Sequence, residues 1–501
     1  MIKFILNHQT VETDLPPGMT VLDFVRYRRN LKGTKIGCRE GDCGACTILV
    51  GELNIDDSVK YRSMTSCLMP LANAGGKHIV TVEGINKPDG ELTGVQQAMV
   101  DESGTQCGFC TVGFVMSLTG FCIDETPKTC ESAVSSIDGN ICRCTGYKSI
   151  ERAAERISEQ LAVSGEPSEK SGAVSEALNF AVEKQIVPEY FSNIGERLLQ
   201  LKETTHGSPL TAHGSLFVGG GTDLYVQRHD EMVYAAAANL FDAAALRGIE
   251  ENGDFVEIGA SATVTDLLVS PVMQRIFPNL YKHLKLVSST PIRNMATLAG
   301  NFVNASPIGD MTAWFLGLDA TIVFDNDREI PLRELYLGYK TLAKAEDECI
   351  AKIRFQKGFS HFNFEKVSKR TFLDIASVNT AISLRIGSPS VSAGGKNTKN
   401  STAENQKKSA LADARASASV IIEAHASAGG VAPIPLYLKQ TSEFLRGREI
   451  SEETISGANE ILQTEISPIS DVRGAADYKR LLVQKLFTAH FVELFGFQPN
   501  D

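Results

Sequence analysis

The sequence lacks an excess of positive charge. Its 501 residues hold 49 Lys and Arg against 60 Asp and Glu, which gives a formal net charge of -11. Proteins that bind nucleic acid normally carry a basic stripe or patch, so this balance argues against nucleic acid as a partner. The rest of the composition, 43% hydrophobic and 22% charged, is ordinary for a globular protein. The length suits about three domains of roughly 150 residues each.

The sequence also lacks a long apolar run at its start. Residues 1–6 are followed at once by polar His8 and Gln9, which is too soon for a signal sequence or a membrane span. We therefore expect a cytoplasmic protein without membrane contact. The cytoplasm keeps thiols reduced, so clustered cysteines there predict metal ligands or catalytic groups rather than disulfides.

What the chain does have is cysteine in two quartets. The first quartet has the plant-type 2Fe-2S spacing C-x4-C-x2-C…C and consists of Cys38, Cys43, Cys46 and Cys67. The second has the spacing C-x2-C…C-x-C and consists of Cys107, Cys110, Cys142 and Cys144. Two one-electron centres in one chain predict an electron conduit. The other cysteines, Cys122, Cys130 and Cys349, form no such pattern and are interpreted as plain buried thiols.

Zinc is the alternative occupant of both quartets, because it too takes four thiolates. Structural zinc usually pairs one close cysteine pair with another such pair, whereas three cysteines of the first quartet crowd a nine-residue loop. This favours an iron-sulfur cluster there. The spacing of the second quartet is less diagnostic and leaves both occupants open.

The periodicity changes along the chain. Alternating apolar residues in 2–15 predict a hairpin, and helical spacing between about 93 and 161 predicts a small helical bundle around the second quartet. Residues 162–177 lose periodicity and are interpreted as an interdomain linker. The remainder is mixed α/β, with a polar low-complexity run at 387–417 between two strand-like segments and a C-terminal helix over 481–495.

Two glycine-containing stretches follow in the α/β part. Residues 219–221 are consecutive glycines after a probable strand, and residues 299–310 combine small residues with amide and hydroxyl groups. Consecutive unhindered N-H groups can bind a pyrophosphate, although the first stretch is neither GxGxxG nor a Walker loop and suits a tight turn as well. The second stretch also suits a surface loop with an Asx turn. Near two iron-sulfur centres these stretches indicate flavin, which exchanges hydride for single electrons.

The motifs resemble a known family, the molybdenum hydroxylases. The resemblance rests on residues 37–47, 106–111 and 139–147 for two iron-sulfur modules, and on 219–223, 293–297, 300–301 and 306–310 for a flavin domain. Residues 366–376 and 429–433 resemble the domain that follows it. With both clusters ahead of the flavin domain and no molybdenum domain after it, the order of parts resembles the small subunit of two-subunit bacterial xanthine dehydrogenases.

The resemblance implies an α+β multidomain fold in five parts. These are a β-grasp, ferredoxin-like 2Fe-2S domain at 1–82, a helical-bundle 2Fe-2S domain at 83–161 and a linker at 162–185. An α/β FAD-binding domain of the vanillyl-alcohol-oxidase (PCMH) type follows at 186–357. An α+β domain of the CO dehydrogenase flavoprotein type, with the 387–417 insertion, occupies 358–501.

The resemblance also implies roles for individual residues. Each quartet binds one 2Fe-2S cluster, and Gln106 and Cys144 lie near the pterin of the partner. Gly219 to Asp223 hold the FAD pyrophosphate, and Lys366 lies beside the isoalloxazine ring, where its charge favours the anionic reduced flavin. The full set of expected FAD contacts is Val218, Gly219, Gly220, Gly221, Thr222, Asp223, Thr297, Gly300, Asn301, Asn304, Ser306, Asp310, Ile350 and Lys366.

The implied function is electron transfer in xanthine dehydrogenase. Electrons leave a molybdopterin centre on a large partner subunit, pass the second cluster and then the first, and reach FAD and NAD. Purine hydroxylation to urate has no catalytic residue on this chain, and the assembly is a heterotetramer of two small and two large subunits. The alternatives are the same role for an aromatic, aldehyde or CO substrate, another acceptor, or a zinc-binding scaffold protein.

Overall fold

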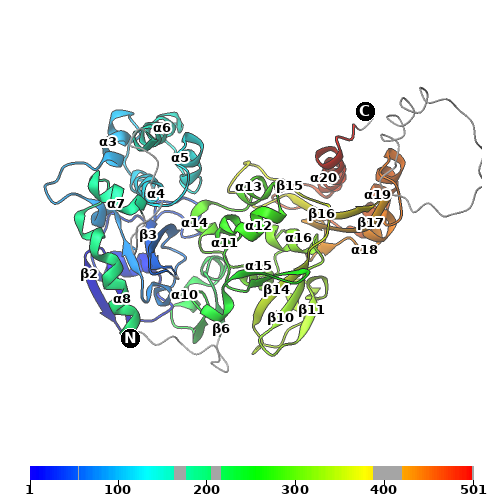
Figure 1. Ribbon diagram of the computed structural model, residues 1–501, viewed down its shortest axis with the longest axis horizontal. Coiled ribbons are helices and arrows are strands. Elements are labelled where there is room, and N and C mark those ends of the chain that lie inside the picture. The colour runs from blue at the N-terminus through cyan, green and yellow to red at the C-terminus, as the bar shows by residue number, and fades with distance from the viewer. Residues whose placement is uncertain (55, 163–175, 205–215, 388–419, 499–501) are drawn as a thin grey trace, which may run out of the picture.

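The computed structural model describes residues 1–54, 56–162, 176–204, 216–387 and 420–498. They form two iron-sulfur-type modules, a central α/β domain and a C-terminal α+β domain, arranged along the long axis of the molecule (Figure 1). The multidomain α+β fold predicted from the sequence is confirmed. Residues 163–175 of the predicted linker and 388–417 of the predicted insertion lie outside the described residues.

The N-terminal module is a five-stranded sheet with the order β2-β1-β5-β3-β4. β1 pairs antiparallel with β2 and parallel with β5, and β3 runs antiparallel to both β5 and β4. Thr20 caps the first helix by accepting from the Asp23 N-H, as its position before an apolar run predicts. The elements are β1 Ile2–Leu6, β2 Gln9–Thr13, α1 Val21–Asp23, η1 Phe24–Arg28, β3 Thr47–Leu53, β4 Val59–Thr65, η2 Leu71–Ala74 and β5 His78–Val80.

This sheet is buried on both faces. Side chains alternate between the faces of a strand, and in β3 Leu49 packs into the core of the helical module while Ile48 and Val50 pack on the opposite side. The opposite core also contains Val218 and Tyr225, which belong to the start of the α/β domain. The ferredoxin-type sheet therefore lies between the helical module and the first elements of the α/β domain.

The helical module packs on one face of that sheet (Figure 1). Its helices are α2 Val82–Ile85, α3 Gly94–Asp101, α4 Thr111–Ile123, α5 Cys130–Ser136 and α6 Lys148–Ala162, followed by α7 Glu176–Glu183, η3 Glu189–Asn193 and α8 Ile194–Thr204. The helical bundle predicted for 93–161 is present. α4 lies at its centre, with every residue from Gly113 to Ile123 buried.

The predicted boundaries at 162–185 and 186 differ from the structure. Part of the predicted linker is helix α7, in which Leu178 and Ala181 are fully buried against the helical module. Phe191, Ile194 and Leu198, predicted to belong to the FAD domain, lie in the same core. The Ser- and Gly-rich sequence before Leu178 gave no sign of the short amphipathic helix that follows it. The buried residues from Leu178 to Leu201 pack with the iron-sulfur modules.

The α/β domain begins with the parallel pair β6 Leu216–Val218 and β7 Ala237–Asn239. A five-stranded antiparallel sheet follows, with the order β11-β10-β14-β9-β8 and a helical layer against it. Its strands are β8 Ile249–Asn252, β9 Phe255–Gly259, β10 Thr321–Phe324, β11 Glu329–Pro331 and β14 Ile350–Gln356, and β12 Tyr336–Gly338 and β13 Thr341–Leu342 form a separate hairpin. The helices are α9 Leu224–Gln227, α10 His229–Met232, η4 Ala244–Leu246, α11 Val264–Val269, α12 Pro271–Ile276, α13 Leu280–Lys285, α14 Thr290–Arg293, α15 Leu298–Val303, α16 Asp310–Leu316 and η5 Leu332–Glu334.

The C-terminal domain is a four-stranded antiparallel sheet with the order β15-β16-β17-β18 and helices against it. The two strands and the long helix predicted from the sequence are present as β16, β17 and α20. The elements are β15 His361–Val367, β16 Val378–Gly387, β17 Val420–Gly429, β18 Leu436–Tyr437, α18 Lys439–Leu445, α19 Glu452–Glu465 and α20 Ala476–Phe495.

The packing of α7 generates a first prediction. Leu178→Ala removes a fully buried side chain and leaves a cavity beside α4, which costs about 2–5 kcal/mol of stability. We expect faster amide hydrogen exchange in α4 and α7. Leu337→Ala, at a side chain that is 69% exposed, is the control and stays within about 0.5 kcal/mol of the parent. Loss of protection in β9 and β14 instead of α4 would assign this segment to the α/β domain.

Candidate functional site: two cysteine quartets beside a large cavity

The first quartet lies on the loop between η1 and β3, with Cys67 coming from the end of β4. The Cys38 and Cys43 thiols contact each other, as do those of Cys46 and Cys67. The Cys38 sulfur accepts from the N-H groups of Glu40 and Cys43, both at 3.3–3.4 Å. The loop thus gathers four sulfurs as two pairs and surrounds them with backbone donors.

Glycine is required in this loop, which we call the first cysteine loop (residues 37–46). A Cβ on Gly37 would lie 2.5 Å from the Cys43 sulfur. Gly44 has a φ of +68°, and its Cβ would lie 2.3 Å from the Gly139 carbonyl oxygen of the helical module. Close approach of backbone to sulfur, and of one module to the other, excludes side chains at both positions.

The second quartet lies in the helical module. Cys110 precedes α4, and Cys142 and Cys144 lie on the loop before α6. The sulfurs of Cys144 and Cys107 are 3.7 Å apart, and the Cys110 thiol contacts that of Cys142. Cys107 and Cys144 are exposed, and the Gln106 side chain donates to the Cys144 carbonyl at 3.3 Å. Gln106 and Cys144, which the resemblance places near a partner's pterin, therefore lie together at the surface.

The thiols within a pair are coupled electrostatically. The contact with Cys43 lowers the pKa of Cys38 to about 5, and the contact with Cys67 lowers the pKa of Cys46. The partner thiol in each of these pairs has a raised pKa, because it donates the shared proton. Burial opposes ionisation of Cys142, but hydrogen bonds from Thr145 and the Cys144 N-H lower its pKa. The pKa is therefore lowered at one thiol of the Cys38–Cys43 pair, at one thiol of the Cys46–Cys67 pair, and at Cys142.

This two-by-two arrangement fits a 2Fe-2S cluster, whose irons are held by four thiolates in all. Among the described residues, no group of three or more His, Cys, Asp or Glu side chains is placed to hold a single metal ion. The assignment of both quartets as cluster ligands remains a proposal.

The two cysteine loops contact each other directly. The Ile141 N-H donates to the Cys43 carbonyl at 3.0 Å, one residue before Cys142. The Asn140 amide donates to the Gly44 carbonyl at 3.1 Å and accepts from the Ser117 hydroxyl at 2.7 Å. The quartets are thus joined through backbone and buried polar contacts.

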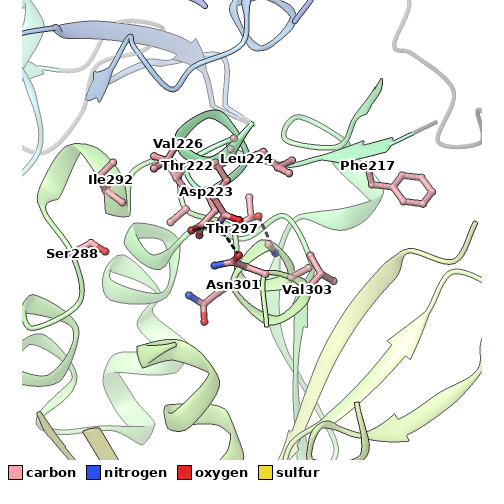
Figure 2. A pocket seen from close by; sticks show the side chains of 18 of the residues that line it. Phe217, Thr222, Asp223, Leu224, Val226, Ser288, Ile292, Thr297, Asn301 and Val303 are labelled. Atoms are coloured by element: carbon pink, nitrogen blue, oxygen red, sulfur yellow. Dashed lines mark hydrogen bonds between the residues drawn. The ribbon is translucent and has the colours of Figure 1, made fainter. Parts of the chain in front are cut away.

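A cavity of about 1670 Å³ opens beside the first quartet. Its walls come from the first cysteine loop, the glycine loop (residues 219–221), helices α14 and α15, the segment 344–350 and the segment 369–377. Thr222, Asp223, Thr297 and Asn301 gather at the centre of one wall, with Ser288 and Ile292 beside them (Figure 2). The volume exceeds the roughly 300–1,000 Å³ of common small-molecule sites, as an extended dinucleotide requires.

The structure brings together most of the residues predicted to contact FAD. The cavity is lined by Gly219, Gly220, Gly221, Thr222, Asp223, Thr297, Gly300, Asn301, Asn304 and Ile350. Val218, Ser306, Asp310 and Lys366 do not line it. Val218 is buried in the core behind the glycine loop.

Lys366 is the clearest difference from the expectation. Its side chain is only 1% exposed, and its ammonium group lies 2.7 Å from both the Asp310 carboxylate and the Leu286 carbonyl. Asn379 donates to the same carboxylate at 2.6 Å. The Lys366 charge is thus neutralised by Asp310 inside the protein, and Lys366 is not among the residues that line the cavity.

The glycine loop meets a steric requirement of a phosphate-binding turn. A Cβ on Gly220 would lie 1.8 Å from the Met295 carbonyl oxygen, and one on Gly219 would lie 2.6 Å from the Thr297 hydroxyl. Gly221 has a φ of +81°. Ser289 is fully buried in the same wall, and its hydroxyl has no hydrogen-bond partner among the described residues. Unhindered backbone and an unsatisfied donor both suit a polar ligand such as FAD.

Sequence reasoning missed several residues of the wall. Glu40, Gly41 and Asp42 line the cavity from the first cysteine loop, and Arg370 reaches Asp42 at 3.6 Å. Lys340, from the β12–β13 hairpin, donates to Asn304. The charge of these residues was visible in the sequence, but contacts between distant segments carried no local signal.

No helix of the described residues is both long and apolar enough to cross a membrane.

The chain matches four domain families in order. Residues 4–72 match a 2Fe-2S iron-sulfur cluster binding domain, and residues 81–155 match a [2Fe-2S] binding domain. Residues 196–355 match an FAD binding domain in molybdopterin dehydrogenase, and residues 407–494 match the CO dehydrogenase flavoprotein C-terminal domain. The chain therefore carries, in this order, the matches to two 2Fe-2S binding domains, to the FAD binding domain of molybdopterin dehydrogenases and to a CO dehydrogenase flavoprotein domain.

Among curated proteins, the chain is similar to xanthine dehydrogenases. It is 29% identical to that of Emericella nidulans over 97% of this chain and 38% of the relative. It is 28% identical to that of Oryza sativa subsp. japonica over 74% of this chain and 33% of the relative. Aldehyde oxidase 1 of Macaca fascicularis is 24% identical over 99% of this chain and 39% of the relative. The chain spans about two fifths or less of the length of these relatives.

A partial likeness to solved structures is also present. Carbon monoxide dehydrogenase from Hydrogenophaga pseudoflava is 22% identical, covers 56% of this chain and 89% of its own, and has a TM-score of 0.46. This likeness adds nothing to the assignment of the site.

The glycine loop generates a second prediction. Gly220→Ala places a Cβ against the Met295 carbonyl, so the loop must shift, at a cost of about 1–3 kcal/mol to flavin binding. We expect purified protein with a reduced flavin-to-protein ratio and unchanged iron content. Gly94→Ala, where an added Cβ meets nothing within 4 Å, is the matched control. Wild-type flavin content in Gly220→Ala would remove this loop from the flavin site.

The first quartet generates a third prediction. Cys43→Ala removes one sulfur of the Cys38 pair, so one 2Fe-2S signal in electron paramagnetic resonance should disappear while the other persists. Outside both quartets, Cys122 and Cys349 are buried as predicted, whereas Cys130, at the start of α5, is exposed. Cys122→Ala should keep both signals. Two intact signals in Cys43→Ala would reject this ligand assignment.

Proposed function

We propose that this chain is the electron-transfer part of a xanthine dehydrogenase. It carries electrons from a molybdopterin centre outside the chain to two 2Fe-2S clusters, FAD and finally NAD, while hypoxanthine and xanthine are hydroxylated to urate. The observation that carries the proposal is the shared wall: Glu40, Gly41 and Asp42, between the ligands Cys38 and Cys43, line the same cavity as the glycine loop.

The order of the centres follows from exposure. Cys107 and Cys144 of the second quartet are exposed, together with Phe109, which is 48% exposed. Cys46 and Cys67 of the first quartet are buried. The exposed end suits a docked molybdopterin domain, and the buried quartet beside the cavity suits the step to flavin. The large partner subunit and the two-plus-two assembly belong to this proposal.

When bound, the clusters would supply one-electron transfer, and FAD would exchange two single electrons for the hydride passed to NAD⁺. The residues of this chain hold the groups at fixed spacing. The glycine loop presents backbone N-H groups to the pyrophosphate, Thr297 caps α15, and Asn301 accepts from the Thr312 N-H and hydroxyl at 3.0–3.1 Å. Asn301 is thereby oriented within the wall.

The purine substrate rests on the named relatives, of which several are xanthine dehydrogenases. The second candidate is the same electron-transfer role in an enzyme for an aldehyde, aromatic or CO substrate, and aldehyde oxidase 1 among the relatives favours the aldehyde. The substrate is decided by the molybdopterin domain that docks at the second quartet. The cytoplasmic location stays a prediction.

The acceptor is tested by a fourth prediction. NADH added anaerobically to the purified chain should bleach first the flavin band and then the iron-sulfur bands, because hydride enters at the cavity and electrons pass the shared wall. Dithionite is the control that reduces every centre directly. Bleaching by dithionite alone would keep the clusters and the flavin but reject NAD. A colourless protein that contains zinc would reject the whole proposal.

A further inference from the structure

One short segment contacts all three parts of the proposed electron path. This interface segment, residues 138–142, ends at Cys142 of the second quartet. It touches the first cysteine loop through Asn140 and Ile141, as described above. Its first residue, Asp138, reaches the α/β domain instead.

Asp138 forms a buried ion pair with Arg293 of α14. The carboxylate and the guanidinium are 2.7 Å apart, and the side chains are 7% and 4% exposed. The other Asp138 oxygen accepts from the Thr290 N-H at 2.7 Å. Both carboxylate oxygens are thus satisfied by α14, and the pair crosses directly between the two modules.

Arg293 connects the ion pair to the cavity wall. One of its terminal nitrogens donates to the carbonyls of Val287 and Ser288 at 3.1 and 2.7 Å. The other donates to Asp138 and to the Thr290 hydroxyl, each at 2.7 Å. Ser288 lines the cavity. Because the guanidinium is a rigid plane, these bonds fix the direction of the interface segment relative to the wall.

Gly139, the residue after Asp138, limits how closely the interface segment approaches α14. A Cβ on Gly139 would lie 2.8 Å from Pro291 and 3.0 Å from Ser289, so the segment lies directly against α14. Contact at Gly139 sets how closely the modules approach. The Asp138–Arg293 pair holds the segment against α14 and so maintains this spacing.

We propose that Asp138 is a positioning residue that, through Arg293, fixes the spacing between the second cluster and the flavin cavity. This rests on the proposed function, since it assumes that both places hold redox groups. The pair acts on geometry and touches neither group. Loss of its charge should therefore change electron exchange between the modules without removing a cluster or the flavin.

The test compares two isosteric variants in the flavin- and cluster-loaded protein. Asp138→Asn removes the charge of the interface pair. Asp266→Asn removes the charge of another ion pair between an iron-sulfur module and the α/β domain, Arg62–Asp266, in which neither side chain bonds the interface segment. Each variant is assayed for both cluster signals, flavin content, the magnetic interaction between the flavin radical and the reduced clusters, and the rate of cluster bleaching after flash reduction of the flavin.

We expect Asp138→Asn to keep both cluster signals and the flavin. Its flash-induced bleaching should slow severalfold, because the rate of electron transfer falls as the two groups move apart. The magnetic interaction should weaken, and Asp266→Asn should keep the parent rate and interaction. An unchanged rate in Asp138→Asn, or equal slowing in both variants, would overturn the proposal.

A second variant tests the positioning role if Asp138→Asn fails to fold. If Asp138→Asn does not yield folded protein, Arg293→Lys keeps the cation but loses the planar set of donors, and the same slowing is expected. Parent behaviour in Arg293→Lys would then overturn the positioning role. Absence of cluster signals from the parent protein is a separate result, which rejects the proposed function itself.

Discussion

Burial of the N-terminal sheet on both of its faces is the constraint on which the rest of the structure depends. In β3, Leu49 belongs to the core of the helical module, whereas Ile48 and Val50 share a core with residues of the α/β domain. A sheet covered on both faces by different modules cannot shift against either without exposing apolar surface. The first cysteine loop, which runs directly into β3, is thereby held between the second quartet and the cavity.

Close backbone contacts at two glycines join the three modules. Gly44 has no room for a side chain because the Gly139 carbonyl lies against it, and Gly139 itself lies against Pro291. The two glycines therefore allow three modules to meet within a few residues. Such contacts suit electron transfer, which depends on separation, and the polar groups at this junction are buried and paired with one another.

How far the sequence predicted the site depended on whether the signal was local. The quartets are recognisable from cysteine spacing and the glycine loop from three consecutive glycines, and the structure gathers each of these groups. The helix from Glu176 to Glu183 was hidden by low-complexity residues before it. The contribution of Glu40 to Asp42 to the cavity wall depends on packing between residues far apart in sequence, and no pattern of spacing or periodicity contains that information.

Lys366 shows why a residue's charge alone is a weak guide to its role. A lysine beside a flavin would act through an uncompensated positive charge, yet burial of such a charge is costly unless a partner neutralises it. Asp310 supplies that partner, and Asn379 and the Leu286 carbonyl complete the set of contacts. The pair joins α16 to β15 and so ties the C-terminal domain to the cavity-bearing domain. Its position indicates that it holds the two domains together, while the charge on the cavity wall comes from other residues, such as Lys340 and Arg370.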